Sequence, residues 1–216
     1  MKRFTLMQFV AAVVLLLANT MAWSDSSMLR PPKGSKVAIV VFEDLECPQC
    51  ARAAPVLHEA AKKYDIPLIQ HDFPLRQHPW SFDAAVNARF FDTKAEKLGD
   101  EYRLYIFQNQ NYVTKQNLQG MTEKWAEQHG VAFPFVVDPS GELTKKVETD
   151  RNLGNQIPLD HTPTVYIVTD FPHATPVTEV KDINQLYQLL DQIIGQAKQS
   201  APASTTQAKK SSKSSH

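Results

Sequence analysis

A strand, a helix and a second strand follow one another closely near the start of this chain. Residues 37–42 are six consecutive apolar residues, most of them β-branched, which is typical of a strand covered on both faces of a sheet. Apolar residues then recur at helical spacing from about residue 48 to residue 64, and residues 68–73 have strand character again. Two strands joined by a helix within 37 residues are expected to be parallel neighbours. The sequence therefore predicts a right-handed βαβ unit in an α/β fold.

A helical stretch and a second β segment follow this unit. Residues 81–154 carry apolar side chains in helical patterns, which predicts a long helical insertion. Residues 164–168 and 177–180 have strand character and are separated by turn-forming residues, so they are expected to pair as a hairpin. Asp182 is expected to cap a last helix that ends near Gly195. The predicted order is βαβ, helical insertion, ββα, around a mixed central sheet.

Both ends of the chain differ in composition from this domain, which we place at residues 36–198. Residues 1–24, in which two basic residues precede the apolar run 9–18, are typical of a secretory signal peptide. An uncleaved membrane anchor is the alternative, although the run is shorter than the roughly 20 residues of a spanning helix. Residues 25–35 form an irregular lead-in, and the Ser- and Lys-rich residues 199–216 are expected to be disordered. We therefore expect a periplasmic or otherwise extracytoplasmic location.

The charge of the chain bears on its partners. The sequence has 23 basic and 23 acidic residues. Without the two basic residues of the signal and the three of the tail, 18 basic and 23 acidic residues remain, a net charge of −5. Because nucleic acids bind through basic surfaces, a nucleic-acid partner is not expected. The sequence shows no clear dimerisation region, so a monomer is favoured.

The chain has two cysteines, Cys47 and Cys50, in the sequence Cys-Pro-Gln-Cys at the start of a predicted helix. A helix N-terminus favours negative charge, so Cys47 is the predicted exposed thiolate nucleophile. Cys50, more buried, is the predicted resolving thiol that displaces a captured sulfur. An inert structural disulfide is disfavoured, since so short a loop adds little stability in the chain-entropy model. A zinc site needs further Cys or His ligands, and haem attachment needs His where Ala51 stands, so neither a metal nor another cofactor is expected.

The cysteine motif and three further segments carry a resemblance to a known family. They are residues 42–50 (FEDLECPQC), 72–79 (DFPLRQHP), 107–110 (FQNQ) and 161–164 (HTPT). These segments resemble those of DsbA-like proteins in the thioredoxin superfamily, and the resemblance extends over about residues 36–195. It implies a thioredoxin fold and thiol–disulfide oxidoreductase activity.

The resemblance also assigns a role to the turn at Thr162 and Pro163. It implies that the bond between them is cis, that Pro163 packs across from the cysteines, and that the Thr162 backbone is offered to an extended substrate strand. Docking by strand addition uses backbone hydrogen bonds and so demands no particular substrate sequence. The predicted site consists of the catalytic residues Cys47 and Cys50, supported by Pro48, Gln49, Thr162 and Pro163.

One position departs from the pattern of the superfamily. Many thioredoxin-fold enzymes carry a buried carboxylate six residues before the first cysteine, where this chain has Val41. We expect Glu43, Asp44 and Glu46 to be solvated residues around the site, with Glu43 as a candidate for proton transfer to the second cysteine. Their negative charge opposes the effect of the helix terminus on the thiol pKa, and His161 is a candidate to offset it if it lies beside the first cysteine.

The leading functional prediction is a dithiol oxidase for exported, cysteine-containing proteins, served by a redox partner for which a membrane-bound protein is the candidate. The direction of electron flow depends on the reduction potential of the cysteine pair, so a reductase or isomerase is the alternative. A non-catalytic module that holds substrates in the same groove is a further alternative. A copper-handling protein is a third, but the sequence offers no Met-rich or Cys-His arrangement to support it.

Overall fold

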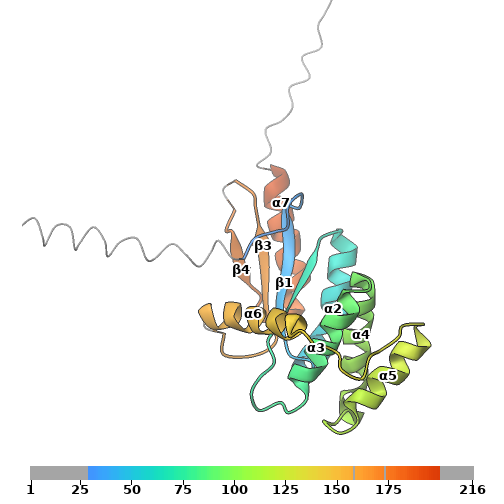
Figure 1. Cartoon of the computed structure of the whole chain (residues 1–216). Coiled ribbons are helices and arrows are strands. Elements are labelled where there is room, and N and C mark those ends of the chain that lie inside the picture. Colours follow the sequence, from blue (N-terminus) through green and yellow to red (C-terminus); the bar gives the residue numbers. More distant parts are fainter. Residues whose placement is uncertain (1–28, 158, 173, 200–216) are drawn as a thin grey trace, which may run out of the picture.

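Four strands form a mixed sheet at the centre of the computed structural model, which describes residues 29–157, 159–172 and 174–199. The strands are β1 (Val37–Glu43), β2 (Leu68–Asp72), β3 (Thr164–Thr169) and β4 (Val177–Glu179), in the spatial order β2-β1-β3-β4 (Figure 1). β1 runs parallel to β2, and β3 is antiparallel to both β1 and β4. The predicted βαβ unit, the hairpin and the mixed sheet are therefore confirmed.

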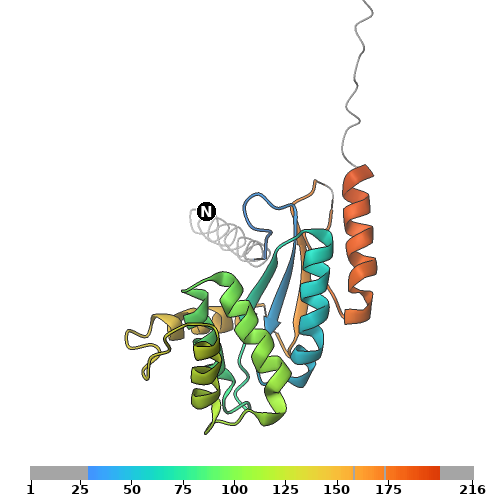
Figure 2. The same ribbon diagram turned by 90° about the vertical axis from the view of Figure 1, so that its right-hand side faces the viewer.

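Helices flank this sheet and fill the stretch between β2 and β3. They are α2 (Pro48–Tyr64), α3 (Ser81–Asp92), α4 (Glu96–Asn109), α5 (Leu118–Gln128), α6 (Glu142–Gln156) and α7 (Leu186–Gln199), with short 3-10 turns η2 (Gln110–Tyr112) and η3 (Ile183–Gln185). Figure 2 shows α2 and α7 on the same side of the sheet. Of the predicted insertion, the helices α3 to α5 gather beyond one end of the sheet, whereas α6 packs on the sheet. We use the name helical insertion for α3, α4, η2 and α5.

The last helix differs from the prediction at both ends. Asp182 accepts a hydrogen bond from the Asn184 main-chain N–H at 3.0 Å, but it caps the turn η3, after which α7 begins at Leu186. α7 continues past Gly195 to Gln199. A helix that stops at glycine usually places that glycine in the left-handed conformation, which Gly195 does not adopt.

Every residue of β1 is buried, because the strand packs against helices on both faces. Val37, Ile39 and Val41 face α2 and α7, where they meet side chains such as Leu57 and Leu186. The residues between them, Ala38, Val40 and Phe42, point to the other face and meet Phe73 and side chains of α6. This alternation explains why the sequence of β1 shows an unbroken apolar run rather than an alternating one.

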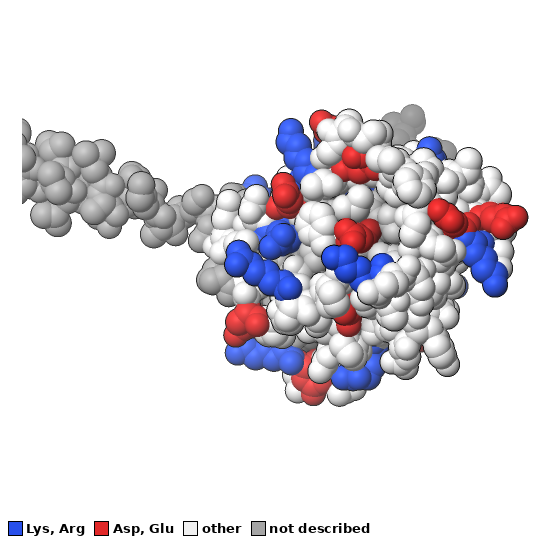
Figure 3. Space-filling model, turned by 60° about the horizontal axis from the view of Figure 1, so that its bottom comes forward, with Lys and Arg blue, Asp and Glu red and all other residues white. Residues whose placement is uncertain are grey.

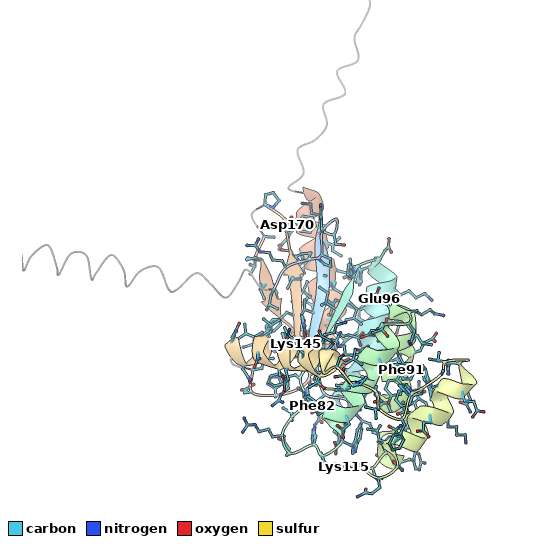
Figure 4. All side chains as sticks on the ribbon, viewed as in Figure 1. Phe82, Phe91, Glu96, Lys115, Lys145 and Asp170 are labelled. Carbon is cyan, nitrogen blue, oxygen red and sulfur yellow. The ribbon has the colours of Figure 1, made fainter. Side chains whose placement is uncertain are left out.

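The helical insertion has a core of its own that is rich in aromatic rings. Phe91 packs against Tyr102 and Trp125, with ring centroids 4.7 Å and 4.8 Å apart. Figure 4 places Phe91 within the insertion, far from Asp170 at the opposite end of the sheet. The same cluster of buried residues includes Leu45, Cys47, Cys50 and Ala54. The cysteine pair therefore lies where the sheet end meets the insertion.

Two of the sequence predictions fall outside the described residues: the signal peptide at residues 1–24 and the tail from residue 200 onward. Of the lead-in, residues 29–35 are described and contain neither helix nor strand, and Leu29 packs under the sheet at 5% exposure. Among the helices in the described ranges, none combines the length and the apolar character needed to cross a bilayer.

Candidate active site

The loop between β1 and α2 presents the first cysteine at a helix start. Cys47 is the N-cap of α2 and Pro48 occupies its first turn, where a missing N–H costs no hydrogen bond. The main-chain N–H of Cys47 donates to the Asp44 carbonyl at 3.0 Å. Unpaired N–H groups of the first helical turn therefore lie next to the Cys47 sulfur, as the sequence predicted.

A side chain from the insertion holds the same loop from the outside. Nε2 of Gln110 donates to the carbonyl oxygens of Leu45 at 2.7 Å and Cys47 at 3.1 Å. The sequence reasoning assigned no role to Gln110, although this residue ends the segment 107–110 that carries the family resemblance. The contact joins the insertion directly to the active-site loop.

The two sulfurs have different surroundings. Cys47 Sγ lies 3.3 Å from the main-chain oxygen of Thr162 and 3.7 Å from Oε1 of Gln49. Cys50 Sγ accepts a hydrogen bond from the Asp44 main-chain N–H at 3.4 Å. Both cysteines are free thiols here, with exposed fractions of 5% for Cys47 and 1% for Cys50. The prediction of an exposed nucleophile was wrong for this state, because Thr162 and the insertion cover Cys47.

These surroundings separate the two thiol pKa values. The hydrogen bond from the Cys50 thiol is the largest cause that lowers the pKa of Cys47, and the main-chain N–H groups of Cys50 and Gln49 add to it. Against the opposing effect of burial, the pKa of Cys47 falls to about 5. Burial raises the pKa of Cys50 far above its ordinary range, and the bond to Cys47 raises it further. At neutral pH the reduced pair is therefore a Cys47 thiolate beside a Cys50 thiol.

The predicted turn faces the cysteines. The Thr162–Pro163 peptide bond is cis, as the resemblance implied. Beside it lies a groove of about 340 Å³, whose lining includes Gln49, Arg52 and Pro163. His161 also lines this groove, but its side chain is 60% exposed and its Nδ1 contacts the Asp160 carboxylate rather than Cys47. The structure thus brings together the predicted site residues Cys47, Cys50, Pro48, Gln49, Thr162 and Pro163.

Two of the three acidic residues before Cys47 are buried, contrary to the prediction that all three are solvated. Glu43 and Asp44 are 3% and 1% exposed, and Glu46 is half-buried. Nε2 of Gln70 donates to Glu43 at 2.9 Å, and the main-chain N–H groups of Trp80 and Ser81 donate to Glu46 at 2.9 Å and 3.1 Å. These donors come from residues that follow the cysteines in the chain, so the local sequence around the acids gave no sign of them.

Burial changes the proton affinity of one of these acids. Desolvation raises the pKa of Glu43 to about 7, although the nearby Arg103 guanidinium acts in the opposite direction. Arg103 is 2% exposed and pairs with Asp92 at 2.8 Å. A carboxyl group that titrates near neutral pH therefore lies near enough to Cys50 for its charge to contribute to the raised Cys50 pKa. Among the described residues, no group of three or more His, Cys, Asp or Glu side chains is arranged to hold a metal ion.

Comparison with known proteins agrees with this geometry. The family model described as thioredoxin matches residues 27–192, which is most of the chain. No match is found among curated protein sequences.

Several solved structures share the fold. α-DsbA1 from Wolbachia pipientis has a TM-score of 0.65 at 15% identity, with 81% of this chain and 98% of that chain covered. A periplasmic thioredoxin-like protein from Salmonella enterica serovar Typhimurium has a TM-score of 0.59 at 18% identity, covering 77% and 88% of the two chains. BdbD from Bacillus subtilis has a TM-score of 0.58 at 16% identity, covering 78% and 91%. At these identities the likeness shows a common fold.

Proposed function

The chain belongs to the thioredoxin family and is a thiol–disulfide oxidoreductase, and we propose that it works as a dithiol oxidase for exported proteins. The observation that carries this proposal is the position of Cys47 as the N-cap of α2, where the Cys50 thiol and the main-chain N–H groups of Cys50 and Gln49 surround its sulfur and lower the pKa of the thiol to about 5. A stabilised thiolate lowers the free energy of the reduced pair, so the oxidised pair tends to pass its disulfide to other thiols.

The proposed reaction has two displacement steps. A substrate thiolate attacks Cys47 Sγ of the Cys47–Cys50 disulfide, a substrate–Cys47 bond forms, and Cys50 leaves and takes up a proton. A second substrate thiolate then attacks the substrate sulfur of this mixed disulfide, and Cys47 leaves as a thiolate. Two electrons pass from the substrate dithiol to the protein. A redox partner must accept them to restore the disulfide.

The proton that Cys50 takes up needs a source. Because its pKa is far above the ordinary range, Cys50 is a poor leaving group unless it is protonated as it departs. Glu43, whose pKa is about 7, precedes Asp44, the residue whose main-chain N–H bonds Cys50 Sγ. We assign the proton donor in this step to Glu43, which supplies the carboxyl group that Val41 does not.

The groove beside Pro163 supports docking of an extended chain. Its lining mixes basic and acidic side chains, among them Arg52, Lys181 and Asp182. Figure 3 shows basic and acidic side chains interspersed over the face turned forward there, with uncharged surface between them. Recognition through the Thr162 backbone suits a groove lined by charges of both signs, because backbone hydrogen bonds accept many sequences. The proposed substrates are therefore cysteine-containing proteins that are still unfolded.

The extracytoplasmic location and the monomeric state are part of the proposal. The location rests on the signal-like sequence of residues 1–24 and suits a protein that passes on disulfides, since such bonds persist in oxidising compartments. The Salmonella protein that shares the fold is described as periplasmic.

The equilibrium with glutathione tests the direction of electron flow. We expect the reduction potential of the Cys47–Cys50 pair to lie nearer the roughly −120 mV of strongly oxidising proteins than the roughly −270 mV of cytosolic thioredoxin. A value near −270 mV would refute the oxidase proposal and favour a reductase. The Cys50→Ser variant should accumulate a mixed disulfide at Cys47, and the Cys47→Ser variant should form none at residue 50 and show no exchange. Retained exchange in Cys47→Ser would contradict the assignment of the nucleophile.

A further inference from the structure

The carboxylate of Asp44 is enclosed by hydrogen-bond donors. Its side chain has no exposed surface. Oδ1 accepts from the main-chain N–H of Glu46 at 2.7 Å and from the Ser81 hydroxyl at 2.5 Å. Oδ2 accepts from the main-chain N–H of Leu75 at 2.6 Å and from Nδ1 of His78 at 2.7 Å. Because an ionised carboxylate only accepts, the imidazole must be the donor in the last contact.

The main chain of the same residue bonds both cysteines. The Asp44 carbonyl accepts from the Cys47 main-chain N–H at 3.0 Å, and the Asp44 N–H donates to Cys50 Sγ at 3.4 Å. Any rotation of the peptide groups on either side of Asp44 would therefore change the hydrogen bonds of both cysteines. Its side chain decides whether such a rotation is possible.

From these contacts we infer that Asp44 is a positioning residue, which acts through its main chain on the reactivity of Cys47 and Cys50. The inference rests on the proposed function, because it concerns the same thiol–disulfide exchange. His78, which holds the carboxylate from the segment between β2 and α3, shares this role.

The hydrogen bond between the Asp44 main-chain N–H and Cys50 Sγ determines where the Cys50 thiol proton points. The Asp44 N–H makes Cys50 Sγ a hydrogen-bond acceptor, so the thiol proton of Cys50 stays available to the Cys47 thiolate. That thiol hydrogen bond is the largest cause of the low Cys47 pKa. If Asp44 moves, Cys50 Sγ loses its fixed position and the Cys47 thiolate loses its strongest donor.

The residues that donate to Asp44 lie in the link between β2 and α3, and this link is itself bonded to the active-site loop at the start of α3. Leu75, His78 and Ser81 span the link from β2 to the first residue of α3, and Glu46 accepts from the main chain of that same first turn. A buried carboxylate is stable only when its lone pairs are filled. Loss of one donor therefore leaves a costly unpaired acceptor, and the loop relaxes to find another.

A purely electrostatic role for Asp44 makes the opposite prediction. Removing a negative charge near Cys47 would lower the thiol pKa, because a nearby like charge disfavours the thiolate. Removing the positioning contacts raises the pKa instead. The sign of the change in Asp44→Asn thus separates the two roles.

The first test uses Asp44→Asn in the full-length protein. Asparagine keeps the size of the side chain but turns one acceptor into a donor, so it cannot accept from both sides. We expect the pH titration of the Cys47 thiolate, followed by absorbance at 240 nm, to move up by about one pH unit. We expect the glutathione equilibrium constant to shift roughly tenfold toward the oxidised protein. A folded variant with an unchanged or lower Cys47 pKa would overturn the inference.

The second test does not depend on the folding of that variant. His78→Ala removes the donor to Asp44, whereas His78→Asn removes the imidazole ring but retains an N–H donor near the position of Nδ1. The exposed neighbour Gln77, changed to Ala, is the matched control. We expect the glutathione equilibrium constant to shift at least fivefold in His78→Ala and to stay within about twofold of the wild type in His78→Asn and Gln77→Ala. Equal shifts in the two His78 variants would reject positioning through this hydrogen bond.

The wild-type protein separates this inference from the proposed function. If the wild type exchanges no disulfides with a reduced substrate, the proposed function fails. If the wild type is active and the Asp44 and His78 variants keep its potential and its Cys47 pKa, the proposed function stands and the positioning role is rejected.

Discussion

Replacing Cys50 by alanine tests the main source of Cys47 reactivity. The Cys50 thiol is the largest cause of the low Cys47 pKa, ahead of the main-chain N–H groups of the helix start. Alanine removes that donor but leaves those N–H groups in place. Serine at the same position supplies a hydroxyl that can donate to the Cys47 thiolate, so Cys50→Ser is the matched control.

The size of the effect follows from the pKa. A fall from 9.0 to about 5 corresponds to about 5 kcal/mol in favour of the Cys47 thiolate. The thiol of the unfolded chain titrates near 9, so at pH 7 the folded reduced protein gains about 3 kcal/mol from this group. The gain is complete above pH 9 and is lost as the pH falls through 5. A charge-assisted hydrogen bond of about 1.5–3 kcal/mol accounts for about one to two pH units of this shift.

We therefore expect the Cys47 thiolate to titrate near pH 5 in the reduced wild type, near pH 6–7 in Cys50→Ala, and closer to 5 in Cys50→Ser. Absorbance at 240 nm measures the thiolate, and the rate of iodoacetamide alkylation as a function of pH gives an independent value. Urea unfolding of the reduced wild type and of Cys47→Ser at pH 4 and pH 7 measures the linked stability, because groups such as Glu43 that titrate in this range affect both proteins alike. Identical titrations for the alanine and serine variants would show that the Cys50 hydrogen bond does not set the Cys47 pKa, and a wild-type midpoint near 9 would show that this pKa is not lowered at all.

Three further perturbations test other parts of the structure. Glu43→Gln removes a carboxyl group that ionises less readily in the folded protein than in the unfolded chain. Its ionisation therefore lowers the stability of the wild type as the pH rises from about 4.5 to 7. Urea unfolding between pH 4 and pH 8 should show that the variant loses about 3 kcal/mol less stability than the wild type. Gln110→Met should cost about 1–2 kcal/mol of unfolding free energy, because two main-chain carbonyls lose their donor, while the exposed Gln108→Met should change it by less than about 0.5 kcal/mol. Gly154→Ala should lower the unfolding free energy by about 1–3 kcal/mol, because the new Cβ would lie 2.5 Å from a ring carbon of Phe73. The control is Gly120→Ala, in an open part of α5. It should leave the unfolding free energy unchanged or raise it by up to about 1 kcal/mol. Equal effects within either matched pair, or an unchanged pH dependence in Glu43→Gln, would contradict the corresponding contact.

The parts of the fold that the sequence predicted are those governed by local pattern. The apolar run of β1, the helical spacing of α2 and the hairpin of β3 and β4 each follow from neighbouring residues, and the structure confirms them. The position of the cysteine pair at a helix start was likewise predictable from neighbouring residues. The cis bond at Pro163 is different, because only the family resemblance implied it.

The parts that the sequence did not predict depend on contacts between distant residues. Asp44 is an acidic residue in a loop, a type of residue that is usually exposed to solvent. Its burial becomes possible only because hydrogen-bond donors from residues 75–81 converge on its carboxylate. The cover over Cys47 has a similar origin, since it comes from Thr162 and from the insertion. The length of α7 was missed because Gly195 was expected to end the helix, whereas its backbone stays helical.

Because both sulfurs lie in the cluster formed mainly by the helical insertion, we expect each turnover to change the packing of that cluster. Disulfide formation removes the thiolate charge and joins the two sulfurs, so the contacts of Ala54 and Leu45 are expected to differ between the two oxidation states. The hairpin of β3 and β4 packs mainly with other clusters and is shielded from this change. Amide hydrogen exchange in α4 and α5 should therefore depend on the oxidation state far more than exchange in β4. The rate of local opening in the insertion would then show whether the cysteine pair is oxidised or reduced.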